Sequence, residues 1–129
     1  MRKFLIEKDQ NIKRAFKALN LSGYKCLVVV NNIEEKLFYG TLSDGDLRRA
    51  LLKKSSLRSK VEKIANKRSK YILQSQFSTA KARKLLKKFK INLIPIVNKE
   101  KKILKVYKID QSIRIAKSKP KTKLIKNIP

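Results

Sequence analysis

The chain contains the same order of helix and strand signals twice, and this internal repeat limits its fold more than any other feature. Each half has four apolar residues that share one face of a helix: Ile12, Ala15, Phe16 and Leu19 in the first, and Ala82, Leu85, Leu86 and Phe89 in the second. Two strands follow each helix, separated by a closing asparagine and a polar stretch: 26–30, Asn31 and 36–42 in the first half, and 93–97, Asn98 and 102–107 in the second. The unit therefore repeats after about 65 residues.

The apolar strands predict an α/β fold. Strands that are apolar without interruption are usually covered on both faces, so each half is expected to be a small mixed sheet with helices packed against it. In the first half, a second helix is predicted over 46–53, with Leu47, Ala50 and Leu51 on its buried face. Residues 61–64 have the pattern of a single helical turn.

Domain boundaries follow from the repeat and from changes in composition. We place a first repeat at 1–57 and a second, degenerate repeat at 58–116. Residues 117–129 are rich in lysine and contain proline, which is typical of a solvated linker or basic tail. A chain of 129 residues that is 42% apolar is long enough to form its own core.

The charge of the chain has two explanations. It carries 35 Lys and Arg against 9 Asp and Glu, a net charge of +26, which favours an anionic partner such as a phosphate ligand or nucleic acid. The abundance of lysine is equally explained by a compositional drift of a whole proteome. Lys81, Lys84 and Lys88 share one helix face that is able to follow a phosphate backbone, so nonspecific nucleic-acid binding is an alternative function.

Several classes of chemistry are excluded by the residues that are missing. The chain has no histidine, so catalysis by Ser-His-Asp or Cys-His groups is excluded in its common forms, and Asp44 with Asp46 supplies too few ligands for a metal. Cys26 is the only cysteine and starts an apolar strand, which predicts an inert core thiol in a reducing compartment. The longest apolar run, 26–30, is too short to span a bilayer. We therefore expect a cytoplasmic protein that does not contact membranes.

The turn Ser43-Asp44-Gly45-Asp46 supports two interpretations. Ser followed three residues later by an acid is a helix-capping pattern. Gly40 and Gly45 are also two of only three glycines in the chain, and glycine lets another molecule approach the backbone. The helix N-terminus after the turn favours a phosphate, and the Asp46 carboxylate is able to accept hydrogen bonds from ribose hydroxyls. Capping together with ligand binding is the hypothesis that we adopt.

The run GTLSDGDLRRALL at 40–52, inside a duplicated helix-strand-strand-helix unit, resembles the cystathionine beta-synthase (CBS) domain pair, known as the Bateman module. The resemblance covers about residues 5–110. It implies tandem repeats, each a small, mostly parallel sheet packed with two helices, related by a pseudo-twofold axis. Members of this family commonly bind AMP, ADP, ATP or S-adenosylmethionine in clefts between the repeats, and pairs dimerise through their helices.

The resemblance also implies which residues bind the ligand. In the first repeat Ser43 corresponds to a phosphate or ribose contact and Asp46 to a ribose contact, with the Gly40 and Thr41 backbone beside them. Weaker candidates for the base start the paired strand: Lys25, Cys26 and Leu27. In the second repeat the corresponding positions depart from the motif and hold Lys105, Lys108 and Gln111, with Asp110 one position off. Because lysine cannot accept a hydrogen bond from a ribose, we expect this second nucleoside site to be lost.

More narrowly, the motif resembles the CBS pair that precedes a sugar-phosphate nucleotidyltransferase domain, and nearly as much the pair that follows the isomerase domain of arabinose-phosphate isomerases. The stretch 123–129 resembles the approach to the first strand of such a transferase, whose glycine-rich nucleotide loop is absent here. We therefore expect a nonenzymatic module that needs no cofactor, binds an adenine nucleotide and modulates a nucleotidyltransferase domain or protein, with 117–129 as transmitter. The alternatives are a basic nucleic-acid-binding protein and a ligand-free dimerisation scaffold.

Overall fold

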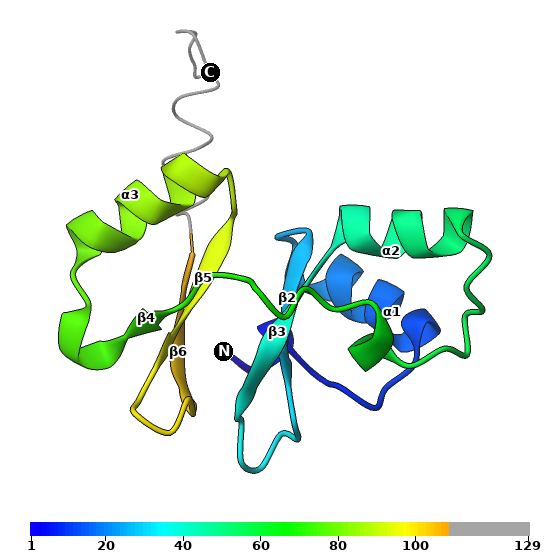
Figure 1. Ribbon diagram of the computed structural model, residues 1–129, viewed down its shortest axis with the longest axis horizontal. Coiled ribbons are helices and arrows are strands. Elements are labelled where there is room, and N and C mark those ends of the chain that lie inside the picture. The colour runs from blue at the N-terminus through cyan, green and yellow to red at the C-terminus, as the bar shows by residue number, and fades with distance from the viewer. Residues whose placement is uncertain (109–129) are drawn as a thin grey trace, which may run out of the picture.

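Two three-stranded sheets face each other at the centre of the molecule, with helices on their outer sides (Figure 1). The structure is a computed structural model that describes residues 1–108. The strands, in chain order, are β1 (Leu5–Glu7), β2 (Cys26–Val30), β3 (Phe38–Ser43), β4 (Ile72–Leu73), β5 (Leu93–Val97) and β6 (Ile103–Lys108). The first sheet has the order β1-β2-β3 and the second the order β4-β5-β6, so the repeat predicted from the sequence is confirmed.

Both sheets have the same topology. The first strand of each pairs with the second in parallel, and the second pairs with the third in antiparallel orientation. The expected α/β class is correct, but parallel and antiparallel pairings are equal in number, so the sheets are mixed rather than mostly parallel. The reason is that a short hairpin joins the last two strands of each half, and a short hairpin produces only an antiparallel pair.

Helices α1 (Ile12–Ser22) and α2 (Asp44–Leu52) cover the first sheet, and α3 (Thr79–Phe89) covers the second (Figure 1). Asn11 and Ser78 cap α1 and α3 with side chains that accept hydrogen bonds from backbone N–H groups. Short 3₁₀ turns are found at η1 (Arg2–Phe4), η2 (Val61–Lys63) and η3 (Gln74–Gln76). The face of α1 and the turn near residue 61 were predicted correctly, whereas α2 begins two residues before the predicted start.

Alternate residues of the central strands point into different layers of the core. On β2, Leu27 and Val29 pack under α1 and α2, whereas Val28 and Val30 contact the other sheet. On β5, the side chains of Ile94 and Ile96 face α3. Burial on both faces explains why these strands are apolar at every position, and each buried side chain of this size stabilises the fold by about 1.5–3 kcal/mol.

A pseudo-twofold relation between the halves is visible in the hydrogen bonds between their hairpins. The Phe38 N–H donates to the Lys101 carbonyl at 2.8 Å, and the Ile103 N–H donates to the Lys36 carbonyl at 2.8 Å. Lys36 and Lys101 both have left-handed backbones, with φ of 57° and 66°. The two bonds are therefore equivalents of each other, and they join the ends of the two sheets.

Asn31 and Asn98 end β2 and β5 in the same way, as the sequence predicted. The Asn31 side-chain oxygen accepts from the backbone of Asn32 and Leu37 at 2.7 and 2.9 Å, and that of Asn98 accepts from Glu100 and Lys102 at 3.0 and 2.9 Å. Each asparagine thus satisfies two backbone donors inside its own hairpin, which is the usual behaviour of asparagine in turns.

Two residues expected in the core are exposed instead. Leu51 is 38% exposed because the stripe of α2 that faces the sheet contains Leu47 and Ala50, and Leu51 lies at its margin. Phe89 is 40% exposed because it is the last residue of α3, and the buried residues of this helix, Ala82 and Leu86, lie further from its end.

Residues 61–66 pack on the first half. Val61 is fully buried in the core of the first half, and Ile64 and Ala65 pack against it. The boundary at 57/58 remains a prediction, as does the second repeat beyond residue 108. Asp110, Gln111 and the segment 117–129 lie outside the described residues.

Candidate functional site

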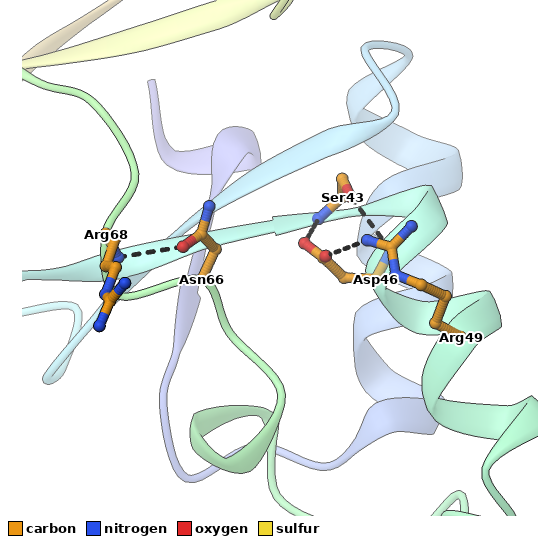
Figure 2. Close-up of polar contacts among 5 residues, drawn as sticks. All are labelled: Ser43, Asp46, Arg49, Asn66 and Arg68. Carbon is orange, nitrogen blue, oxygen red and sulfur yellow. Dashed lines mark hydrogen bonds and ion pairs between the residues drawn. The ribbon is translucent and has the colours of Figure 1, made fainter.

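The turn between β3 and α2 is a complete capping box. The Ser43 Oγ accepts a hydrogen bond from the Asp46 N–H at 3.1 Å, and the Asp46 Oδ2 accepts one from the Ser43 N–H at 2.9 Å. Figure 2 shows Asp46 between Ser43 and Arg49 at the start of the helix. The capping role of Ser43 and Asp46 is thus realised, and it fixes both side chains at the helix N-terminus.

The second carboxylate oxygen of Asp46 takes part in a weaker interaction. Its Oδ1 accepts from the Arg49 Nη2 at 2.6 Å, and the side chains of Asp46 and Arg49 are 20% and 65% exposed. Exposed ion pairs of this kind contribute about 0–1 kcal/mol, so a competing donor can replace the arginine. Asp44 is paired in the same way with Arg48. Within residues 1–108, no group of three or more candidate metal ligands is found.

Gly40 allows the linker between the repeats, which is the segment 64–71 between η2 and β4, to cross β3. A Cβ at this position would lie 2.5 Å from the Asn66 carbonyl oxygen. The Thr41 N–H donates to that oxygen at 3.1 Å, and the Asn66 N–H donates to the Thr41 carbonyl at 2.8 Å. The space beside Gly40 is therefore filled by the chain itself, so here the expectation that the glycine makes room for another molecule is wrong.

A cleft of about 230 Å³ lies where the linker passes between the two halves. Its lining residues come from the starts of β2 and β5, from β3, from the linker and from the end of α3: Cys26, Thr41, Asn66, Arg68, Ser69, Lys70, Phe89, Ile91 and Leu93. One wall is apolar, and the linker supplies two cations. Among residues 1–108, no acid lines the cleft, and the sequence from 63 to 99 contains none.

Of the predicted ligand residues, Cys26 and Thr41 line the cleft directly. Ser43 pairs with Cys26 across the β2–β3 ladder, which places the capping turn beside the cleft. The Asp46 carboxylate is close enough to act on the Cys26 thiol. Burial first, and then this negative charge, raise the pKa of Cys26 to about 12. The thiol is therefore protonated at neutral pH and is not a nucleophile.

Leu27 and Lys25 do not line the cleft. The Leu27 side chain is fully buried between the first sheet and its helices. The Lys25 side chain is exposed, and its backbone is left-handed with φ of 57°. The Lys25 carbonyl accepts from the Asp44 N–H at 3.0 Å, so this residue supports the turn through its backbone.

Sequence reasoning missed the linker and the second half of the cleft. Asn66 holds the linker in place, because its side-chain oxygen accepts from the Arg68 N–H at 3.0 Å (Figure 2). Its carbonyl also accepts from the Ser69 hydroxyl at 2.9 Å. Arg68 and Lys70 lie in a segment with no periodic pattern. The only signal available was their position between two repeats.

The positions of the second repeat that replace the motif lie against aromatic rings. The Lys105 Nζ is 4.3 Å from the centroid of the Phe77 ring, and the Lys108 Nζ is 5.5 Å from that of Phe4. Neither lysine lines the cleft, and neither offers a hydrogen-bond acceptor in its side chain.

Comparison with known proteins identifies the fold. No family model matches the sequence. An uncharacterized protein of Helicobacter pylori strain 26695 is 32% identical over 111 residues, which cover 86% of this chain and 33% of the relative. The chain thus spans about a third of the length of the curated relatives that it matches.

Solved structures with the same fold include AcuB from Vibrio cholerae, with a TM-score of 0.73, 16% identity, and coverage of 87% of this chain and 81% of that one. A CBS domain protein from Pyrobaculum aerophilum complexed with AMP has a TM-score of 0.68 and 17% identity, with coverage of 87% and 88%. The CBS domain pair of protein MJ0100, in complex with 5′-methylthioadenosine and S-adenosyl-L-methionine, has a TM-score of 0.68 and 15% identity, with coverage of 88% and 87%. The chain therefore has the tandem CBS fold. Within residues 1–108, no helix has the length and apolar character needed to cross a bilayer.

Proposed function

We propose that this chain is a nonenzymatic regulatory CBS pair that binds an adenine nucleotide in the cleft between its halves. The observation that carries the proposal is the position of this cleft, which lies beside the Ser43–Asp46 turn and is lined by the cations Arg68 and Lys70. Two structures with the same fold were solved with adenosine-containing ligands, which supports this choice of ligand.

Each part of the cleft suits one part of a nucleotide. The apolar wall formed by Cys26, Ile91 and Leu93 suits a base. The Asp46 Oδ1 accepts hydrogen bonds from ribose hydroxyls once Arg49 has moved away, and Arg68 with Lys70 attracts the phosphates. The cleft of about 230 Å³ lies slightly below the range of about 300–1,000 Å³ typical of ligand pockets, so the phosphates extend over the linker.

Binding between two halves provides a means of regulation. A ligand that contacts both halves shifts their arrangement only by the difference between its affinities for the two arrangements. We propose that a sugar-phosphate nucleotidyltransferase, as a linked domain or a partner, responds to this shift. The support for this partner is the resemblance of the sequence at 40–52 to the CBS pairs of such enzymes. We also propose a cytoplasmic homodimer, which light scattering will test.

Calorimetric titration with AMP, ADP, ATP, GTP and S-adenosylmethionine tests the proposal. We expect ATP to bind more tightly than AMP and adenosine. We also expect the affinity to fall with added salt, because exposed lysine–phosphate attraction is screened beyond about 8 Å at physiological ionic strength. Ser43→Ala and Asp46→Ala are expected to weaken binding. Ser78→Ala is the matched control, because it removes the cap of α3 away from the cleft. Absence of binding by every ligand refutes the proposal.

Nucleic-acid binding is the second candidate, and the uneven distribution of charge favours it. The segment 63–99 contains no Asp or Glu, and Lys81, Lys84 and Lys88 are all exposed on α3. This candidate predicts tight, salt-sensitive binding to duplex DNA in fluorescence anisotropy. Replacement of the three lysines by glutamine would abolish that binding, whereas Asp46→Ala would leave it unchanged.

A further inference from the structure

Phe89 presents an aromatic ring to the cleft without contributing to the core. It is 40% exposed, it lines the cleft, and it belongs to none of the three buried clusters. The apolar face of α3 is filled by Ala82 and Leu86, which are buried. Packing within residues 1–108 therefore does not account for a large aromatic side chain at this position.

The ammonium groups of two lysines lie over the ring of Phe89 instead. The Lys70 Nζ lies 4.6 Å from the ring centroid and the Lys88 Nζ lies 5.5 Å from it. Lys88 belongs to α3 itself, whereas Lys70 belongs to the linker, so the contact between Lys70 and Phe89 connects two different walls of the cleft. An ammonium group over an exposed ring is held weakly, and a better partner for either group displaces it.

We propose that Phe89 is a specificity-determining residue that stacks on the base of the nucleotide, and that Lys70 leaves the ring to pair with a phosphate of the same ligand. This inference rests on the proposed function, because it requires a nucleotide in the cleft. The exchange improves the contacts of both groups: the ring gains a flat aromatic partner, and the ammonium gains a charged acceptor. Stacking requires only a π-face, so Phe89 recognises bases as a class and does not distinguish ATP from GTP.

The test compares ATP with inorganic triphosphate, which lacks the base. We expect Phe89→Ala to weaken ATP binding about tenfold and to leave triphosphate binding unchanged. Phe89→Tyr is expected to retain the affinity for ATP. Lys70→Gln is expected to weaken ATP and triphosphate but not adenosine. Thermal unfolding of each variant verifies that it is folded.

A direct readout is available because the chain contains no tryptophan. Phe89→Trp introduces a single fluorophore, which ATP is expected to quench and triphosphate is not. Phe77→Trp is the matched control, since Phe77 also has a lysine 4.3 Å from its ring centroid but does not line the cleft. If the wild type binds ATP while Phe89→Ala binds it equally well, or if ATP leaves Phe89→Trp unquenched, the role of Phe89 is refuted and the proposed function stands. If the wild type binds none of the titrated nucleotides, both the role of Phe89 and the proposed function are refuted.

Discussion

Gly40 lies so close to Asn66 that a Cβ at position 40 would be 2.5 Å from the Asn66 carbonyl oxygen. This contact joins the middle of β3 to the linker between the repeats. It is reinforced by the paired hydrogen bonds between Thr41 and Asn66, at 3.1 and 2.8 Å. The linker cannot retreat from an added methyl group without losing these bonds.

We therefore predict that Gly40→Ala lowers the free energy of unfolding by about 1–3 kcal/mol. Gly45→Ala is the matched control. Its added Cβ would lie 3.2 Å from the flexible side chain of Arg49 and 3.7 Å from the Ser43 Oγ, which is an ordinary contact distance. We therefore expect no loss and a gain of up to about 1 kcal/mol from helix propensity. Urea denaturation of both variants measures the difference. Equal stabilities would show that the linker adjusts without cost.

Under the proposed function, Arg49 competes with the ribose hydroxyls for the Asp46 Oδ1. We predict that Arg49→Ala changes the free energy of unfolding by less than about 1 kcal/mol, because the ion pair is exposed. It is expected to tighten the binding of adenosine, which carries no phosphate, about two- to fivefold. Arg48→Ala is the control, since Arg48 pairs with Asp44 on the same helix. Weaker adenosine binding by Arg49→Ala would show that the arginine assists the ligand.

Lys90 caps α3 with a left-handed backbone, with φ of 54°. A side chain in this conformation costs about 1 kcal/mol relative to glycine. We predict that Lys90→Gly raises the free energy of unfolding by about 1 kcal/mol. Lys84→Gly, in the exposed middle of the same helix, is expected to lower it by a similar amount. Thermal and urea unfolding give both values, and a loss of stability in Lys90→Gly would contradict the prediction.

The Cys26 thiol makes stability depend on alkaline pH. Its pKa is 9.0 in the unfolded chain and about 12 in the folded protein, because of burial and the Asp46 carboxylate. Above pH 9.0 the unfolded thiol ionises while the folded thiol stays protonated, so ionisation favours unfolding. The contribution of the thiol is complete below pH 9.0 and is lost as the pH rises towards about 12.

We expect the free energy of unfolding of the wild type to fall more steeply than that of Cys26→Ala over this interval, by up to about 1.4 kcal/mol per pH unit. Comparison of the two proteins removes the effect of every other group, since they differ only at position 26. Parallel curves would show that the thiol ionises equally in the folded and unfolded states. Slow alkylation of the folded wild type by iodoacetamide, relative to the unfolded chain, is an independent measurement of the same protection.

Local sequence patterns were enough to predict individual helices and strands. The helical spacing of Ile12, Ala15 and Leu19 identified α1, and the uninterrupted apolar run 93–97 identified β5. The Ser-x-x-Asp pattern predicted the capping box, because all its hydrogen bonds lie within four residues. The prediction that Phe89 is buried was wrong, because helical spacing alone does not show where the surface that packs against the helix ends.

The sequence by itself determined that this chain is a duplicated α/β unit with a capped turn after the second of the two strands predicted in its first half, since these features depend on residues that are neighbours along the chain. Only the tertiary structure decided what surrounds that turn. The contact of Gly40 with Asn66 and the approach of Lys70 to Phe89 join segments that are distant in sequence. Such contacts form only after the two sheets pack face to face, so the propensities of neighbouring residues cannot predict them.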